Sequence, residues 1–260
     1  MGALNSLYKF YKNYKGKKGI VGMSDKGRII PYFLVEKTAF PTMIIQYCIH
    51  AREYITTYLA LKQIADFSRR ARCGRVFFIP MLNPDGVNIA QSVNCLYKAN
   101  ANGVDLNVNF DALWGKGKEN VFCKGSQNYV GPYAFSEKES VALRDFTYLV
   151  KPQMTVSYHS KGEEIYFEFN QDENYFRDRY LAQIVSKKTG YAIKSTIGSV
   201  GGYKDWCIDK LKIPALTIEV GSDKLAHPIK RSKLGKIYKQ NADVVCSLIQ
   251  GLNEVCKKNL

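Results

Sequence analysis

The chain has 260 residues, of which 46% are hydrophobic, and its formal net charge at pH 7 is +15. A chain of this length and apolar content can bury one large core, and it contains no long linker, repeat or low-complexity tract, so we expect one domain that spans residues 1–260. No apolar run is long enough to cross a bilayer, so no membrane span is expected. The 7 cysteines are odd in number and have no close pairs, which argues against a disulfide framework and predicts mostly buried thiols.

In chain order, the first half is expected to hold a basic N-terminal extension or helix, an antiparallel edge hairpin, a buried strand, an amphipathic helix and a short strand. These are residues 1–18, Ile20–Gly22 with Ile29–Val35, Thr42–Ile49, a helix lined by Tyr54, Tyr58, Leu61 and Ala65, and Val76–Ile79. The hairpin follows from the turn signal Ser24–Gly27 between two apolar runs, and the helix from apolar residues at helical spacing.

The second half continues the alternation of strands and helices. The expected elements are a helix opened by a capping box at Ser136–Glu139 and running to Val150, strands at Val156–His159 and Ile165–Phe169, a helix from about Asn174 to Gly190, the strand before Glu219, and one final helix lined by Ile237, Val245, Leu248, Leu252 and Val255. This order predicts an α/β fold: a single domain with a mixed parallel and antiparallel twisted sheet sandwiched by helices. Such sheets bind ligands at the carboxyl ends of their strands.

The segment His50-Ala51-Arg52-Glu53 directly follows the buried strand. At the head of a helix, a histidine and a glutamate three positions apart lie on one face, where both can reach one metal ion. Alone this pair is a weak signal, because a helix-start pair with no ligand role is the commoner outcome.

A second histidine, His159, also stands at the end of a short β-branched and aromatic run. Zinc in hydrolases commonly takes three protein ligands and leaves a fourth position open, so His50, Glu53 and His159 make a complete ligand set for one zinc ion. The third histidine, His227, precedes a proline and is expected in a loop.

Glu219 lies inside the otherwise apolar strand Ile213–Gly221. Burying a carboxylate is costly without a partner, so this residue is either part of a structural salt bridge or functional. The functional option is a general base that takes a proton from the attacking water and later passes it to the leaving amine. The chemistry indicated is metal-assisted hydrolysis.

Together these motifs resemble the zinc carboxypeptidase family, the M14-type metallocarboxypeptidases, over nearly the whole chain. The matching segments are His50–Glu53, Asn83–Val87, Gly103–Phe110, Tyr158–Ser160, Gly201–Trp206 and Thr217–Glu219. The resemblance implies that His50, Glu53 and His159 bind one zinc ion and that Glu219 is the base.

The resemblance also assigns two cationic side chains. Arg52 is implied to contact the substrate beside the scissile carbonyl. Lys98 occupies a position where relatives often carry an arginine that steadies the oxyanion, and a lysine can still supply positive charge there as a single point donor.

The sequence departs from the family where relatives that remove C-terminal residues hold the substrate's terminal carboxylate. Those relatives usually have Asn-Arg where this chain has Asn107-Val108, and valine cannot pair with a carboxylate, although Asn107 remains as a neutral contact. A tyrosine that many relatives carry before the Gly-Gly turn is missing from Thr196–Val200, and Tyr203 is expected to substitute in part. Lys161 stands where another tyrosine is expected.

Lys204 falls, by resemblance, at the base of the pocket that selects the side chain next to the cut. With Lys161 it would accept a carboxylate, although a lysine on a solvated loop is the commoner case. The pattern Asp105–Asp111 resembles bacterial γ-D-glutamyl-meso-diaminopimelate peptidases. Their substrate, the peptidoglycan stem peptide, carries a distal carboxylate on diaminopimelate that suits Lys204.

Three alternatives stay open. An ordinary carboxypeptidase for L-peptides with acidic ends is disfavoured by Val108. An inactive protein that binds the cell wall would keep the fold and lose the chemistry. A nucleic-acid binder would use the basic clusters Lys12–Lys18 and Lys230–Lys236, but no motif supports it and the aromatic residues are dispersed, so the expected partner is a stem peptide or another acidic peptide.

The first residues lack the long apolar core of a secretory signal. As given, the chain is therefore expected in the cytoplasm, unless export to the cell wall uses a route or leader that this sequence does not show.

Overall fold

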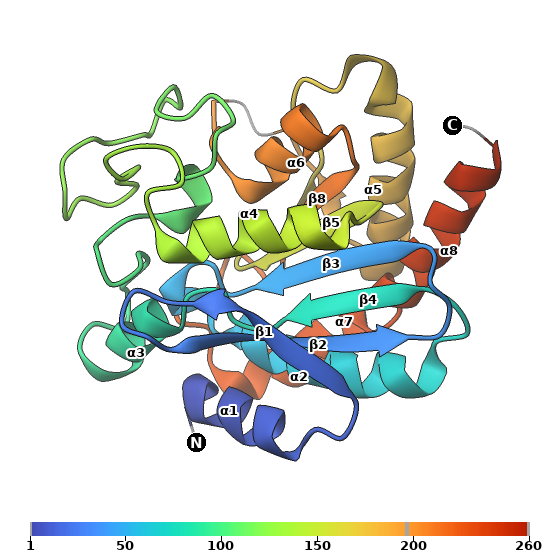
Figure 1. Ribbon diagram of the computed structural model, residues 1–260, viewed down its shortest axis with the longest axis horizontal. Coiled ribbons are helices and arrows are strands. Elements are labelled where there is room, and N and C mark those ends of the chain that lie inside the picture. The colour runs from blue at the N-terminus through green and yellow to red at the C-terminus, as the bar shows by residue number, and fades with distance from the viewer. Residues whose placement is uncertain (1, 196–197, 259–260) are drawn as a thin grey trace.

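The computed structural model describes residues 2–195 and 198–258, and within these residues an eight-stranded sheet has helices on both faces (Figure 1). The strand order is β1-β2-β4-β3-β5-β8-β6-β7. The strands are β1 Lys17–Met23, β2 Ile29–Glu36, β3 Thr42–Tyr47, β4 Arg75–Ile79, β5 Met154–His159, β6 Glu164–Tyr166, β7 Ala192–Ile193 and β8 Ala215–Glu219.

The sheet is mixed, as predicted. The neighbouring strands β4, β3, β5 and β8 run parallel, whereas β2 pairs antiparallel with β4 and β6 pairs antiparallel with β8. The predicted edge hairpin is confirmed, since β1 pairs antiparallel with β2 at one end of the sheet. Every residue of β3 is buried, which explains the apolar run Met43–Ile45, because a parallel strand covered on both faces needs no polar alternation.

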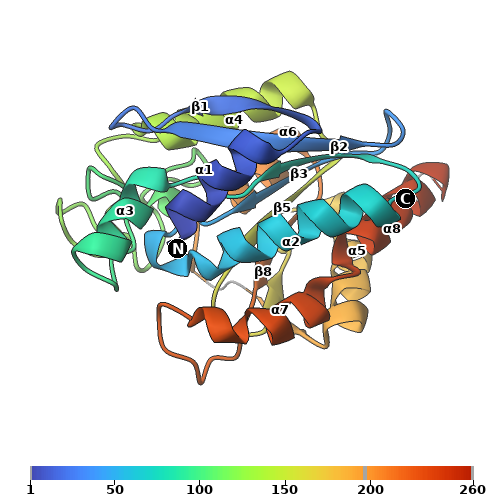
Figure 2. The ribbon, with the colours of Figure 1, turned by 90° about the horizontal axis from the view of Figure 1, so that it is seen from below.

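Alternation along the strands separates two hydrophobic cores. Met43 and Ile45 of β3 face one core and Ile44 faces the other, as the period of two requires. The first core packs α1 Ala3–Asn13, α2 Ile55–Arg70, α5 Tyr175–Thr189, α7 Leu234–Asn241 and α8 Val244–Lys258. The second packs α4 Lys138–Val150 and α6 Tyr203–Leu211. Figure 2 shows α4 and α6 on one side of the sheet and α1, α2 and α7 on the other.

The prediction of a single final helix is wrong, because the chain forms two helices, α7 and α8, with a break between them. Gln63, from α2, donates a hydrogen bond to the carbonyl oxygen of Asn241 at 3.0 Å. An unbroken helix would direct that oxygen to the N–H four residues later. A contact from a distant helix therefore ends α7.

The capping box predicted at Ser136–Glu139 is also wrong, although the helix ends at Val150 as expected. The residue that precedes α4 is Glu137, and its side chain caps nothing. Its carboxylate instead accepts a hydrogen bond from the buried side-chain amide of Asn100 at 2.6 Å, so this carboxylate does not bond to the backbone at the helix start. The strand predicted at Ile165–Phe169 is shorter than expected, as β6 ends at Tyr166.

The cysteines are all free thiols, which agrees with the absence of a disulfide framework, but the prediction that most are buried is wrong. Only Cys48 and Cys207 are buried, and Cys95, Cys123 and Cys256 are exposed. None of the helices formed by residues 2–195 and 198–258 has the length and apolar character needed to cross a membrane.

Candidate metal centre and pocket

Three parallel strands deliver the candidate residues to one edge of the sheet. His159 is the last residue of β5 and Glu219 the last of β8, and the two lie opposite each other in register. His50 follows β3 and precedes a short 3-10 turn, η1 Ala51–Glu53, which leads into α2. Because parallel strands end at the same edge, residues more than a hundred positions apart in sequence meet here.

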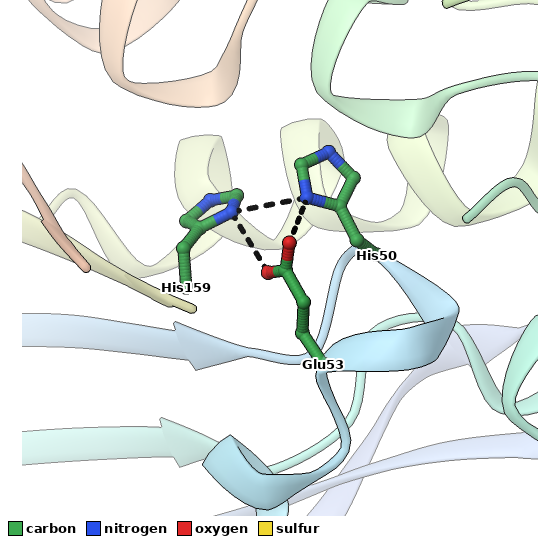
Figure 3. Close-up of side chains that lie close together, drawn as sticks. All are labelled: His50, Glu53 and His159. Atoms are coloured by element: carbon green, nitrogen blue, oxygen red, sulfur yellow. Dashed lines mark hydrogen bonds and ion pairs between the residues drawn. The ribbon is translucent and has the colours of Figure 1, made fainter. Parts of the chain in front are cut away.

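The side chains of His50, Glu53 and His159 point toward one another (Figure 3). The Nδ1 atom of His50 lies 2.8 Å from Oε1 of Glu53, and Nδ1 of His159 lies 3.2 Å from Oε2 of the same carboxylate. The two Nδ1 atoms are 3.2 Å apart. One potential ligand atom from each residue lies within 4.8 Å of the others.

This arrangement fits a metal ion. Two ring nitrogens and a carboxylate converge on one buried point, where their lone pairs need a cation between them. Nitrogen and oxygen donors in this number are the set that zinc takes in hydrolases. The cluster therefore passes the chemical test for a zinc site.

Asp105 holds His50 from the side away from the cluster, and the sequence analysis gave it no role. Its Oδ1 lies 3.1 Å from Nε2 of His50 and accepts a hydrogen bond from the backbone N–H of Asn107 at 3.0 Å. Its Oδ2 lies 2.5 Å from the Lys98 ammonium. A carboxylate in this position fixes the tautomer and orientation of a metal-binding imidazole.

Asp105→Asn is expected to weaken zinc binding by about ten- to a hundredfold, because asparagine keeps the size of the side chain but loses the charge that holds His50. Competition of the purified protein with a chromophoric chelator measures the affinity. The comparison variant is Asp111→Asn, six residues away and exposed, which should bind zinc like the wild type. Equal affinity in both variants would remove Asp105 from the site.

Burial and neighbouring charges shift the pKa values of His50, His159 and Glu53 in different directions. Burial disfavours the charged form of His50, but the carboxylates of Glu53 and Asp105 outweigh it and raise the pKa of His50 to about 9. Burial lowers the pKa of His159. Burial would raise the pKa of Glu53, but the two imidazoles hold it well below its usual range.

The pKa of Glu219 shifts in the opposite direction to that of Glu53. Burial, reinforced by the charge of Glu53, raises the pKa of its carboxyl well above the usual range. Its Oε2 atom is buried without a hydrogen-bond partner, and Glu219 makes no ion pair with any residue that the structure describes. The structural salt bridge considered as the alternative role is therefore absent from the described part of the chain.

A cavity of about 500 Å³ opens beside this cluster. It is lined by His50, His159 and Glu219, and also by Lys98, Asn107, Val108, Lys204, Asp205 and Thr217. Lys98, Asn107 and Lys204 thus reach the cavity that the resemblance assigned to them, and Lys204 is buried there and does not lie on a solvated loop.

Tyr203 does not substitute for the missing tyrosine, and that prediction is wrong. The side chain is fully buried in the second core, where its hydroxyl lies 2.7 Å from Oγ1 of Thr147 on α4. Tyr203 is the first residue of α6, and the cavity lining includes its neighbour Lys204 but not Tyr203. Thr196 and Ile197, in the stretch where the tyrosine was expected, lie outside the described residues.

Two further cationic side chains do not line the cavity. The Lys161 ammonium pairs with the Asp223 carboxylate at 2.7 Å, so the prediction that it shares a pocket with Lys204 is wrong. Arg52 donates a long hydrogen bond, 3.4 Å, to the carbonyl oxygen of Leu96. Its contact with substrate stays a prediction.

Sequence reasoning missed one whole wall of the cavity. Residues 109–137 form no helix or strand, and this long loop supplies Lys118, Glu119, Asn120 and Asn128 to the lining. Long ordered loops of this kind are often functional, but their path has no periodic signal in the sequence.

Known proteins resemble this chain in sequence and fold. Gamma-D-glutamyl-L-diamino acid endopeptidase 1 of Lysinibacillus sphaericus is 29% identical over 227 residues, which make up 74% of this chain and 57% of that protein. The chain thus spans little more than half the length of that relative. Bovine thrombin-activatable fibrinolysis inhibitor, solved in complex with tick carboxypeptidase inhibitor, superimposes with a TM-score of 0.87 at 21% identity, over 99% of this chain and 97% of that one. Murein-tripeptide amidase MpaA from Escherichia coli O157 gives a TM-score of 0.64 at 21% identity, over 91% and 92% of the two chains.

The two solved structures share the fold. A family model described as zinc carboxypeptidase matches residues 15–243, and zinc is the metal for which the donor cluster is suited. Since the match takes in His50, Glu53 and His159 as well as Glu219, the chain belongs to the zinc carboxypeptidase family.

Proposed function

We propose that this chain is a zinc-dependent peptidase that hydrolyses the bond between γ-D-glutamate and meso-diaminopimelate in peptidoglycan stem peptides. The convergence of His50, Glu53 and His159 on one buried point carries the proposal that the chain is a metallopeptidase. The similarity to a protein named as a γ-D-glutamyl-L-diamino acid endopeptidase supports the choice of substrate.

The proposed metal ligands are His50, Glu53 and His159. A zinc ion held there supplies Lewis-acid polarisation of the scissile carbonyl and lowers the pKa of water. Glu219 is the proposed base: its unpaired carboxylate lines the cavity beside both histidines, where it can take a proton from the attacking water and return it to the leaving amine.

Lys98 and Arg52 are proposed to stabilise negative charge on the substrate. The Lys98 ammonium lines the cavity and is held by Asp105 and by Asn128, whose Oδ1 accepts its hydrogen bond at 2.7 Å. A fixed ammonium costs little reorganisation when charge develops on the carbonyl oxygen. Arg52 belongs to the same turn as Glu53 and is proposed to act at the edge of the cavity.

Val108 counts against an ordinary carboxypeptidase for L-peptides. It lines the cavity where relatives that remove C-terminal residues carry a carboxylate-binding arginine, and an apolar side chain offers no partner for a free terminal carboxylate. Asn107 is proposed as a neutral contact to the substrate backbone, and Lys204 as a contact to the side chain of diaminopimelate.

The test compares two substrates. Zinc-loaded protein is incubated with L-Ala-γ-D-Glu-meso-diaminopimelate and with a matched peptide of ordinary L-residues, and the products are followed by mass spectrometry. Release of diaminopimelate from the first peptide alone is expected. Cleavage of the L-peptide alone would indicate an ordinary carboxypeptidase, and cleavage of neither would favour a protein that binds the cell wall without cutting it.

A further inference from the structure

The cavity contains a buried ion pair between neighbouring residues. The Lys204 ammonium lies 2.5 Å from Oδ1 of Asp205, and their side chains are only 7% and 6% exposed. Both residues line the cavity that contains His50, His159 and Glu219. Burying the pair costs both charges their hydration, and their mutual attraction repays this cost only with good geometry and further hydrogen bonds.

The pair is held rigidly at the start of α6. The backbone N–H of Gly202 donates to Oδ2 of Asp205 at 3.1 Å, and the Lys204 ammonium donates to the carbonyl oxygen of Glu168 at 2.8 Å. Close packing fixes the turn as well, since a Cβ atom at Gly202 would lie 3.1 Å from Oδ1 of Asn107. An ammonium has three N–H donors and a carboxylate has about four acceptor positions, so both groups keep capacity for a ligand.

The charges around the cavity nearly balance, although the whole chain carries +15. The lining includes three lysines, Lys98, Lys118 and Lys204, and four carboxylates, Asp105, Glu119, Asp205 and Glu219. A ligand with only a carboxylate would be attracted by Lys204 and repelled by Asp205, and a ligand with only an ammonium would meet the reverse. A group that carries both charges on adjacent atoms can satisfy both residues.

We propose that the Lys204–Asp205 pair recognises a zwitterionic amino-acid head at the far end of the substrate side chain. Lys204 binds its carboxylate and Asp205 binds its ammonium. This inference rests on the proposed function and adds which feature of diaminopimelate the protein recognises. The side chain of diaminopimelate has three methylene groups after the backbone carbon and ends in a carbon that carries both an ammonium and a carboxylate.

The fold places this pair within the same cavity as the proposed base. Thr217 lines the cavity two residues before Glu219 on β8, so the two side chains lie on the same face of the strand. Helix α6 packs against β5 and β8 on that face. A side chain that leaves the cut bond near Glu219 and runs along β8 therefore reaches toward the start of α6.

Three peptides test separately what the ammonium and the carboxylate of the side-chain head contribute to cleavage. Each begins with L-Ala-γ-D-Glu and ends with meso-diaminopimelate, with L-2-aminopimelate, which lacks the distal ammonium, or with L-lysine, which lacks the distal carboxylate. We expect kcat/KM for the last two to be lower by about ten- to a hundredfold, the range for loss of a charge-assisted hydrogen bond. Equal cleavage of the aminopimelate and diaminopimelate peptides would overturn the role of Asp205 and leave the proposed peptidase function standing.

A binding measurement with free amino acids distinguishes failure of this inference from failure of the proposed function. Free meso-diaminopimelate and free L-2-aminopimelate are titrated calorimetrically into the zinc-loaded protein. Binding of meso-diaminopimelate at least about tenfold more tightly supports the inference even where no peptide is cut. Equal binding of the two compounds overturns it, whatever the protein cleaves.

Variants test the two side chains directly. Asp205→Asn keeps an acceptor for the Gly202 N–H and should lower kcat/KM for the diaminopimelate peptide about tenfold or more, with little loss for the aminopimelate peptide. The uncharged double variant Lys204→Met/Asp205→Asn leaves no lone buried charge that could unfold the protein. It should cleave all three peptides at similar low rates.

The chain offers a matched control on the same helix. Asp209 and Lys210 are also adjacent and paired, at 3.0 Å, but their side chains are 24% and 44% exposed and they lie outside the cavity lining. Asp209→Asn/Lys210→Met should keep the wild-type preference for the diaminopimelate peptide. If the Lys204→Met/Asp205→Asn variant keeps that preference as well, the proposal is wrong.

Discussion

Replacing Glu219 with glutamine is expected to lower kcat by about 10²- to 10⁴-fold, the contribution of a positioned general base. Glutamine has nearly the same shape as glutamate but cannot take a proton from water. The end of β8 and the buried surroundings of the side chain should remain unchanged. Turnover of the γ-D-glutamyl peptide measures the rate, and atomic absorption should still find one zinc ion per chain.

Glu254→Gln is the matched control for this prediction. Glu254 lies on α8, accepts a hydrogen bond from the Tyr180 hydroxyl and lies outside the cavity lining. Its substitution should leave kcat close to that of the wild type. A wild-type rate in Glu219→Gln with full zinc content would mean that another group handles the proton.

The same Glu219 substitution should stabilise the zinc-free protein at pH 7. Burial and the charge of Glu53 raise the pKa of Glu219 well above its usual range, so the folded protein holds this proton more tightly than the unfolded chain. The stability that Glu219 contributes is thus present below its unfolded pKa and is lost as pH rises toward the folded value. Glutamine removes this loss, and urea unfolding at pH 5 and pH 7 should show a smaller difference for the variant than for the wild type.

The grouping of the metal cluster and Glu219 at one edge of the sheet could be predicted because these residues obey rules visible in the sequence. His159 and Glu219 each end an apolar strand, and parallel strands end together, so the topology alone brings them to one edge. The pair His50 and Glu53 needed only local geometry. Nothing local marks Asp105, which reaches Nε2 of His50 from a segment without a long helix or strand.

The direction of side chains on α6 could not be predicted in the same way, because the helix itself was not expected. Once its first turn is known, Lys204 and Asp205 line the cavity while Tyr203 enters the core, so the phase of one helix decides which neighbour lines the cavity. A comparable signal for the missed helix α3, Pro84–Ser92, was present: Asn83 caps it by accepting from the Gly86 N–H at 2.9 Å.

Replacing His159 with alanine is expected to abolish stoichiometric zinc binding and, with it, hydrolysis. His159 supplies one of the three converging donor atoms, and a buried alanine offers no ligand in its place. Zinc should consequently lose its stabilising effect: at a free concentration a hundred times the Kd it adds about 2.7 kcal/mol to the unfolding free energy of the wild type. Metal analysis and thermal unfolding with and without zinc measure both effects.

His227→Ala is the control of the same residue type. His227 lies in a loop before Pro228, as predicted, and is not part of the donor cluster, so this variant should keep one zinc ion and its stabilisation by zinc. The metal-free wild type serves as the reference for folding, and far-UV circular dichroism should show the same secondary structure in His159→Ala. A His159→Ala protein that still binds one zinc ion per chain would show that the ion is bound elsewhere. The roles proposed for Glu219 and for the Lys204–Asp205 pair would then be wrong, because both assume a zinc ion at this cluster.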